Sequence, residues 1–595
     1  MTTHDEFPDQ ACSGPRLSRR TALRAAGATG LGLAGAAAAA GHSTASQAPT
    51  GSGEKQPNIL VILVDEMRDW QWFPDQAVLN EAFPAMARLQ DGAVRFGRHY
   101  CSAAMCTPSR GSLVTGLYAH QTGLTLTIGG NVSTFIAGEQ NPAILHGGAN
   151  ATPAATPAAP EATPVVSAPP YPVLDPRFPT WGTLLRQQGY DTYWYGKWHV
   201  NDESCDMEQY GFGGGTCPSP NGAPGEGQVE DPNIADQAIA WLQNQNHATP
   251  WCTTVSFINP HDIQFYPRQT RNLDGQSDPP SVIDNMPENY ETAADLARER
   301  KPHLQLASIV ALIQVFGEIP HRGPNFERGW LKMLDLYFQL HKYVDTEIGR
   351  VLDALEAQPE VAENTIIVFT SDHGDYVGSH GLRGKGAGLY DEGIRVPLWV
   401  KDPTGKYAAN PETPRNQITS AVDLVPMLLT LATGDTNWKN DPDLAYLANR
   451  HDLVSIMQDP DAPGRDHALH TTDEDGFEYG PLMFPFLENA PFHVLGAITE
   501  DAKLGVYTHW AADSDEILPD DQEFEFYDYT TDEGRLELAN TAGDDNPKFT
   551  ALYDKLMTDL LPNEIRAPLP EPLETARNEA MAGTLARIAF DRAVG

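Results

Sequence analysis

Positive charge is scarce in this sequence, and long apolar runs are absent outside its N-terminal region. The chain has 40 lysine and arginine residues against 80 acidic ones, a formal net charge of −40. This balance argues against a nucleic-acid partner, because phosphate binding needs a basic face. With 41% hydrophobic and 20% charged residues in 595, the composition excludes a disordered chain and predicts a globular protein with a large core and a second, smaller one.

The N-terminal region predicts an export signal. "RLSRRTALRAAG" is followed by an uncharged Ala/Gly/Leu run over residues 25–41 and by the small-residue stretch "STASQA", the order of a signal peptide. The pair Arg19-Arg20 resembles a twin-arginine signal. We therefore expect residues 1–48 to be removed and the mature protein to be periplasmic or secreted. The run is too rich in Ala and Gly for a permanent membrane span.

The rest of the chain alternates between predicted strands and helices up to about residue 435. Buried-strand patterns such as "NILVILVD" and "NTIIVFTSD" alternate with amphipathic helices, which is typical of a parallel sheet. We expect an α/β fold with a large, mostly parallel sheet flanked by helices on both faces. Residues 57–435 form the predicted catalytic domain, interrupted by a low-complexity insertion over 149–172. Residues 436–595 are expected to form a smaller C-terminal α+β domain with an antiparallel sheet, and a tail.

Polar and charged residues follow four of the apolar strands. Asp65-Glu66, Lys197 with His199, His261, and Asp372-His373 each come directly after one of these runs. Ligands in an open parallel sheet bind outside the carboxyl ends of the strands. The sequence therefore predicts one site at that edge. The carboxylates are hard oxygen donors suited to Ca²⁺ or Mg²⁺.

One of only six cysteines, Cys106, opens the stretch "CTPSR". Thr107 suits a helix cap and Pro108 suits a first helical turn, so a helix is expected to begin here. The N-terminus of a helix favours an anion, either bound or forming, beside the cysteine. Cys205 and Cys217 flank a Gly-rich loop and are a candidate disulfide pair in an oxidising compartment.

The ordered blocks of the sequence resemble those of the type I sulfatases of the alkaline-phosphatase superfamily. "CTPSRGSLVTG" matches the sulfatase signature, and "GKWH", "NPHD", "TSDHGDYVGSHGLRGKG" and "YDEGIRVPLWV" follow in family order. The resemblance covers roughly residues 57–561. It implies a sulfuric ester hydrolase acting on a sulfated small molecule or glycan.

The resemblance also implies a modified nucleophile. Cys106 is expected to be oxidised to formylglycine by a maturation enzyme and hydrated to a gem-diol, whose one hydroxyl attacks sulfur while the second later expels sulfate. Arg110 and Lys197 would steady the diol, and His199 would act as base on the second hydroxyl. Lys385 would hold the sulfate oxygens, and His261 would protonate the leaving alcohol.

The metal site implied by the resemblance consists of Asp65, Glu66, the residue at position 106, Asp372 and His373. One divalent ion is expected, Ca²⁺ in preference to Mg²⁺ or Mn²⁺. Glu66 departs from the family, in which Asp is frequent at this position, so its part in coordination stays open. Two alternatives also stay open: a phosphodiester or phosphonate monoester hydrolase of the same superfamily, and a non-catalytic relative that binds sulfate or glycans.

Overall fold

The computed structural model describes residues 55–71, 74–128, 169–201, 206–268, 283–473, 490–543 and 545–594. The predicted signal peptide and residues 149–168 of the predicted insertion lie outside these ranges, as does Cys205. Cys217 is disulfide-bonded, whereas Cys101, Cys106 and Cys252 are free and buried.

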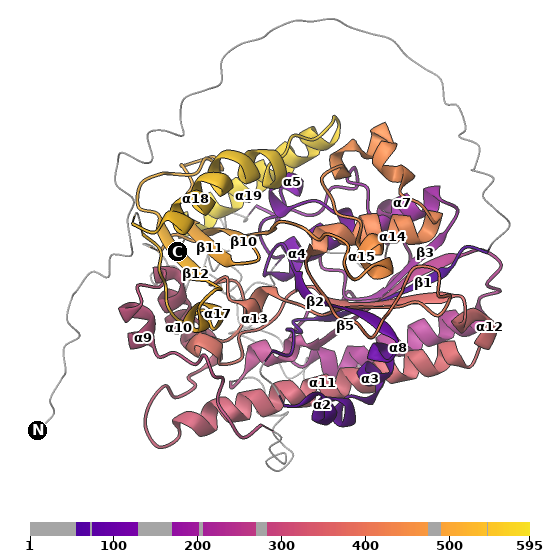
Figure 1. The fold of residues 1–595 in the computed structure, drawn as a ribbon, viewed down its shortest axis with the longest axis horizontal. Coiled ribbons are helices and arrows are strands. Elements are labelled where there is room, and N and C mark those ends of the chain that lie inside the picture. The colour runs from indigo at the N-terminus through magenta and orange to yellow at the C-terminus, as the bar shows by residue number, and fades with distance from the viewer. Residues whose placement is uncertain are drawn as a thin grey trace, which may run out of the picture.

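The larger sheet has eight strands in the order β4-β3-β5-β1-β6-β7-β2-β8 (Figure 1). All neighbouring pairs are parallel except those that involve β7, which runs antiparallel to both β6 and β2. The strands are β1 (Asn58–Asp65), β2 (Ala93–Tyr100), β3 (Asp191–Gly196), β4 (Gly213–Gly214), β5 (Trp251–Pro260), β6 (Thr365–Ser371), β7 (Leu398–Lys401) and β8 (Arg415–Ser420).

Strand β1 shows why the sheet is covered on both sides. All eight of its residues are buried, and alternate side chains enter different hydrophobic cores because neighbouring residues of a strand point to opposite faces. Ile59, Val61 and Leu63 belong to one core, and Leu60, Ile62 and Val64 belong to the other. Because helices cover both faces of the sheet, every position of this strand is buried and can be apolar.

The helices of the two layers come from separate parts of the chain. The first core includes residues of α4 (Cys106–Thr115), α7 (Trp181–Gln187), α14 (Leu424–Thr433) and α15 (Leu453–Gln458). The second includes residues of α2 (Gln76–Ala82), α3 (Pro84–Gln90), α8 (Glu226–Asn244) and the 31-residue α11 (Phe326–Glu356). Figure 1 shows the two groups on opposite sides of the sheet.

The C-terminal region contains a second sheet, with four antiparallel strands in the order β12-β11-β10-β9. These strands are β9 (Ala468–Thr472), β10 (His493–Ile498), β11 (Ala502–Thr508) and β12 (Glu523–Asp528). The helix α18 (Pro547–Lys555) and the π-helical segment Leu556–Ile565 pack against this sheet, and α19 (Leu573–Val594) packs against α5 (Ala119–Thr122). The predicted α/β fold class with an added antiparallel sheet is confirmed.

The remaining helices are short or lie in the connections. They are α9 (Ala293–Arg298), α10 (His303–Phe316), α12 (Pro359–Ala362), α13 (Asp391–Ile394) and α17 (Asp532–Arg535). Among the described residues, no helix combines the length and apolar character that crossing a bilayer requires.

Candidate active site

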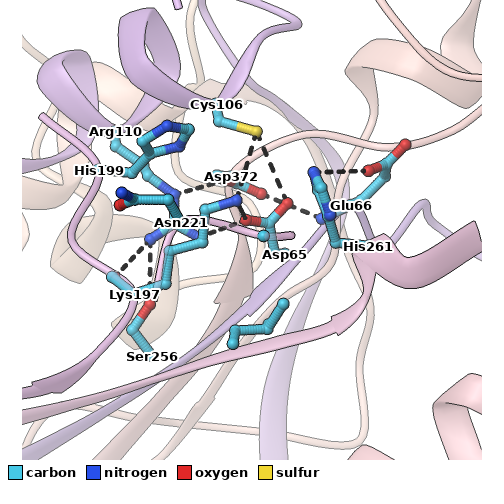
Figure 2. Close-up of polar contacts among 12 residues, drawn as sticks. Asp65, Glu66, Cys106, Arg110, Lys197, His199, Asn221, Ser256, His261 and Asp372 are labelled. Carbon is cyan, nitrogen blue, oxygen red and sulfur yellow. Dashed lines mark hydrogen bonds and ion pairs between the residues drawn. The ribbon is translucent and has the colours of Figure 1, made fainter. Parts of the chain in front are cut away.

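The predicted site residues converge at one edge of the larger sheet (Figure 2). The four strands singled out in the sequence, β3, β5, β1 and β6, are consecutive neighbours and run parallel. Their carboxyl ends therefore meet at this edge, where α4 also begins. All ten predicted residues are buried: Asp65, Glu66, Cys106, Arg110, Lys197, His199, His261, Asp372, His373 and Lys385.

Cys106 lies at the centre of the group and its side chain is 0% exposed. Its Sγ atom lies 3.2 Å from His373 Nε2, 3.2 Å from Lys385 Nζ and 3.7 Å from Lys197 Nζ. The Asp65 Oδ1 atom lies 3.8 Å from the same sulfur. The close approach to Asp65 that the sequence required is therefore present.

The start of α4 differs from the prediction that Thr107 caps it. The helix begins at Cys106 itself, its N-cap residue is Met105, and no side chain caps it. The Thr107 hydroxyl instead donates to the His199 carbonyl at 2.8 Å and accepts from Ile128 N–H at 3.0 Å. Thr107 thus joins two loops of the site, and this use of its oxygen excludes the predicted cap.

Four groups can share one metal ion. Ligand atoms of Asp65, Cys106, Asp372 and His373 lie within 4.8 Å of one another. Two carboxylates, an imidazole and the side chain at position 106 make a donor set that fits a divalent cation. A second possible group joins Asp65 to Glu66 and His261.

Arg110 and Lys197 compensate the negative charge of the carboxylates. Arg110 donates from Nη2 to Asp65 Oδ2 at 2.9 Å and from Nε to Asp372 Oδ2 at 2.8 Å. Lys197 Nζ lies 2.6 Å from Asp65 Oδ2. Because all four side chains are buried, these opposite charges offset the free-energy cost of burying the carboxylates.

His199 presents a defined tautomer to the site. Its Nε2 atom lies 2.7 Å from the Ile128 carbonyl oxygen, which only accepts hydrogen bonds, so Nε2 carries the ring proton. The other nitrogen, Nδ1, then holds a lone pair, and the His199 ring lies beside the Cys106 side chain. The backbone of His199 has a φ of +58°, a region that non-glycine residues rarely occupy.

Lys385, Glu66 and His261 form the side of the site away from Arg110. The Glu66 Oε2 atom lies 3.0 Å from Lys385 Nζ and 3.7 Å from His261 Nε2. The Glu66 carboxyl also hydrogen-bonds to the Asp375 carboxyl. Sequence analysis did not identify Asp375, because "HGD" carries no sign that its last residue turns back toward Glu66.

The electrostatics of the site favour an anion at position 106. Burial alone would raise the pKa of the Cys106 thiol, but the charges of Lys197 and Lys385 hold that pKa well below its ordinary value. Burial, together with the charges of the same two lysines, lowers the pKa of His261 to about 3, so its ring is neutral. Burial, with a contribution from the Asp375 carboxyl, raises the pKa of Glu66 well above its usual range despite Lys385.

Gly222 is a second site residue that sequence analysis missed. It adopts a φ of +92°, and a Cβ atom there would lie 2.7 Å from His261 Cε1 and 2.9 Å from Lys197 Nζ. Only glycine lets the loop approach both side chains so closely. The signal is the Gly-rich stretch "PNGAPGEG", which does not show which glycine contacts the site.

A third cluster of possible ligands lies elsewhere and is already neutralised. His380, Glu392 and Glu537 come within 4.8 Å of one another, but Arg68 Nη2 lies 3.4 Å from Glu392 Oε1 and Lys503 Nζ lies 2.5 Å from Glu537 Oε1. These cations compensate the charges of the two carboxylates.

Comparison with known proteins agrees with this geometry. The family model named Sulfatase matches residues 57–434. The chain is 26% identical to the choline-sulfatase of Rhizobium meliloti, over 63% of this chain and 68% of that protein. It is 24% identical to the N-acetylglucosamine-6-O-sulfatase of Bacteroides thetaiotaomicron, over 64% of this chain and 68% of that protein.

A solved structure shows the shared fold. The phosphonate monoester hydrolase of Agrobacterium radiobacter superposes with a TM-score of 0.56 at 21% identity, covering 88% of this chain and 96% of that one. At this identity the likeness concerns the fold alone.

Proposed function

Since this chain belongs to the sulfatase family, it is an enzyme that hydrolyses sulfate esters, and we propose that it does so with an oxidised Cys106 and one divalent metal ion. The observation that carries the proposal is the position of Cys106 Sγ, which lies among Asp65 Oδ1, His373 Nε2 and the ammonium groups of Lys197 and Lys385. A reacting side chain at this point meets both metal ligands and groups that stabilise negative charge.

The metal would be held by Asp65, Asp372, His373 and the oxygen that oxidation places at position 106. When bound there, a divalent cation supplies a Lewis acid that neutralises charge on the reacting oxygens. Carboxylate oxygens favour Ca²⁺, while the imidazole of His373 is also compatible with Mn²⁺. Loading the metal-free protein with each ion and measuring turnover distinguishes them.

Formylglycine at position 106 would be hydrated and supply the nucleophilic hydroxyl. His199 is the base in this proposal, because its Nδ1 lone pair can accept a proton from a second hydroxyl at the same carbon. Ile128 fixes the tautomer through Nε2, so the proton can enter only at Nδ1. Arg110 holds Asp65 and Asp372 in place through its two hydrogen bonds.

Lys385 and His261 would act on the substrate. The Lys385 ammonium, 3.2 Å from Cys106 Sγ, is placed to contact the sulfate oxygens. The His261 ring is neutral in the resting site because its pKa is about 3. An anionic substrate beside the ring raises this pKa, which lets His261 hold a proton for the leaving alcohol.

The substrate is proposed to be a sulfated small molecule or glycan. Relatives named for choline sulfate and for a 6-O-sulfated N-acetylglucosamine support both classes. The proposal includes export through the Arg19-Arg20 signal, which N-terminal sequencing of the mature protein in a periplasmic or secreted fraction would test.

Two measurements test the chemistry. The peptide that contains Cys106 should be ~18 Da lighter than the unmodified sequence, the difference between a thiol and an aldehyde. Nitrophenyl sulfate should be turned over faster than a nitrophenyl phosphonate ester. The Cys106→Ala variant should lose turnover, while Cys252→Ala, which alters another buried free cysteine at the end of β5 away from the site, should retain it. An active Cys106→Ala protein would refute the proposal.

A further inference from the structure

Glu66 directly follows Asp65, the proposed metal ligand. The backbone turns sharply at Glu66. Its φ is +69°, a conformation that costs on the order of 1 kcal/mol or more for a residue with a Cβ. Its N–H donates to Asp372 Oδ1 at 3.1 Å, and its carbonyl accepts from Tyr337 Oη at 2.8 Å. The peptide groups on both sides are therefore fixed, and they determine the direction of the side chain.

The Glu66 carboxylate contacts groups that would act on substrate. Figure 2 shows it facing the His261 ring, with Oε2 3.7 Å from His261 Nε2 and 3.0 Å from Lys385 Nζ. Lys385 Nζ is also 3.2 Å from Cys106 Sγ. An ammonium group thus lies against both Glu66 and the reacting side chain, and its charge opposes a metal ion at Glu66 Oε2.

The second Glu66 oxygen is held by Asp375. Oε1 is buried without a partner among the described N–H and O–H donors, and so is Asp375 Oδ2; the two carboxyls interact with each other, which requires that one of them carries a proton. Asp375 Oδ1 accepts from Val377 N–H at 2.7 Å and Gly384 N–H at 3.1 Å. Asp375 therefore ties Glu66 to the loop that ends in Lys385.

We infer that Glu66 is a positioning residue, not a metal ligand: it holds the Lys385 ammonium and the His261 ring in the orientation that receives the sulfate ester. Four other groups bring ligand atoms together around position 106 without Glu66. A free lysine side chain has many rotamers, and fixing one conformation costs entropy. Glu66 removes that cost at binding by holding Lys385 beforehand. The roles of Lys385 and His261 rest on the proposed function.

Three variants test the inference. Glu66→Gln keeps an oxygen that accepts from Lys385 and gains an N–H that donates to Asp375. Glu66→Ala removes both contacts. Asp65→Asn alters a proposed metal ligand and is the matched control. For each, Ca²⁺ affinity is measured by calorimetry on the metal-free protein, and KM, kcat and inhibition by inorganic sulfate are measured with nitrophenyl sulfate.

The Ca²⁺ affinities of Glu66→Gln and Glu66→Ala should lie within about threefold of the parent value. The Ca²⁺ affinity of Asp65→Asn should fall about a hundredfold, the largest effect expected from changing a residue that only supports a metal ligand. Glu66→Ala should raise the KM and the inhibition constant for sulfate about 10- to 100-fold, the value of a charge-assisted hydrogen bond. Glu66→Gln should recover most of this loss.

Two results would overturn the inference. One is a loss of Ca²⁺ affinity in Glu66→Gln comparable to that in Asp65→Asn, which would make Glu66 a ligand. The other is an unchanged KM and unchanged inhibition by sulfate in Glu66→Ala. Because metal affinity is measured without turnover, this part of the test stands even if the proposed sulfatase chemistry fails.

Discussion

The Nη2 atom of Arg110 lies 2.9 Å from Asp65 Oδ2, and neither side chain is exposed to solvent. The same guanidinium also pairs with Asp372, so one residue compensates two buried carboxylates. A planar guanidinium with donors in a fixed geometry can do this, whereas a lysine ammonium is a single point charge.

Replacing Arg110 should therefore destabilise the fold as well as the site. Arg110→Ala leaves both carboxylates with less compensation in a buried environment, and we expect a loss of about 3–5 kcal/mol in the free energy of unfolding. Arg110→Lys should recover part of it. Urea unfolding, with and without Ca²⁺, measures the effect. An unchanged unfolding midpoint in Arg110→Ala would show that the pair contributes nothing.

Metal removal should lower the thermal stability. Without the cation, Arg110, Lys197 and His373 are the groups beside Asp65 and Asp372 that can offset their charge. A ligand at a thousand times its dissociation constant stabilises the folded state by about 4 kcal/mol. We expect chelation to lower Tm and Ca²⁺ to restore it, with Asp65→Asn responding little. Identical Tm values for chelated and Ca²⁺-loaded parent protein would contradict the predicted site.

Gly222→Ala should reduce turnover, because the new Cβ would press on His261 and Lys197. Gly225 provides a control in the same loop: it also has a positive φ, of +73°, but a Cβ there would have no atom within 4 Å. Gly225→Ala therefore has the backbone strain without the contact. Comparing kcat/KM for the two variants separates the effect of backbone strain from the effect of the Cβ contact. Equal losses of kcat/KM would show that strain alone is responsible.

His341 predicts a pH-dependent contribution to stability. It is buried, its Nδ1–H donates to the Tyr337 carbonyl at 2.7 Å, and burial lowers its pKa from 6.5 to about 3. As pH falls below 6.5, the unfolded chain takes up a proton at this position that the folded protein does not accept. The contribution of His341 to stability is therefore lost on acidification toward pH 3.

The variant His341→Phe isolates this effect. It removes the titrating group, and a ring can still pack against Trp70 and Tyr337. Between pH 7.5 and 5 the stability of the parent should fall by about 2 kcal/mol relative to the variant, at 1.4 kcal/mol for each pH unit below 6.5. Chemical unfolding at both pH values gives the difference. A difference that does not change with pH would show that His341 takes up its proton as readily in the folded protein as in the unfolded chain.

The position of the site could be predicted because it depends on pattern. Continuous apolar runs indicate strands covered on both faces, and parallel neighbours bring their carboxyl ends together. Asp65, His261 and Asp372 therefore meet although long stretches of sequence separate them. The mostly parallel sheet followed from the same reasoning.

Other features depend on contacts between loops that are distant in the sequence. Local sequence patterns do not predict such contacts. The antiparallel β7 is only four residues long and carries no periodic signal of its direction. Thr107 has the composition of a helix cap, but two neighbouring loops compete for its oxygen. Asp375 and Gly222 matter only because distant residues lie against them.

The complete burial of Cys106 determines when its proposed oxidation can take place. An oxidising enzyme needs access to the thiol, and in the finished protein no part of this side chain reaches solvent. Lys385, which closes one side of the sulfur, is added by the ribosome 279 positions later. Until Lys385 has been synthesised, the oxidising enzyme can still reach the Cys106 thiol. Under the proposed chemistry, a chain that folds before Cys106 is oxidised therefore stays inactive until it unfolds again.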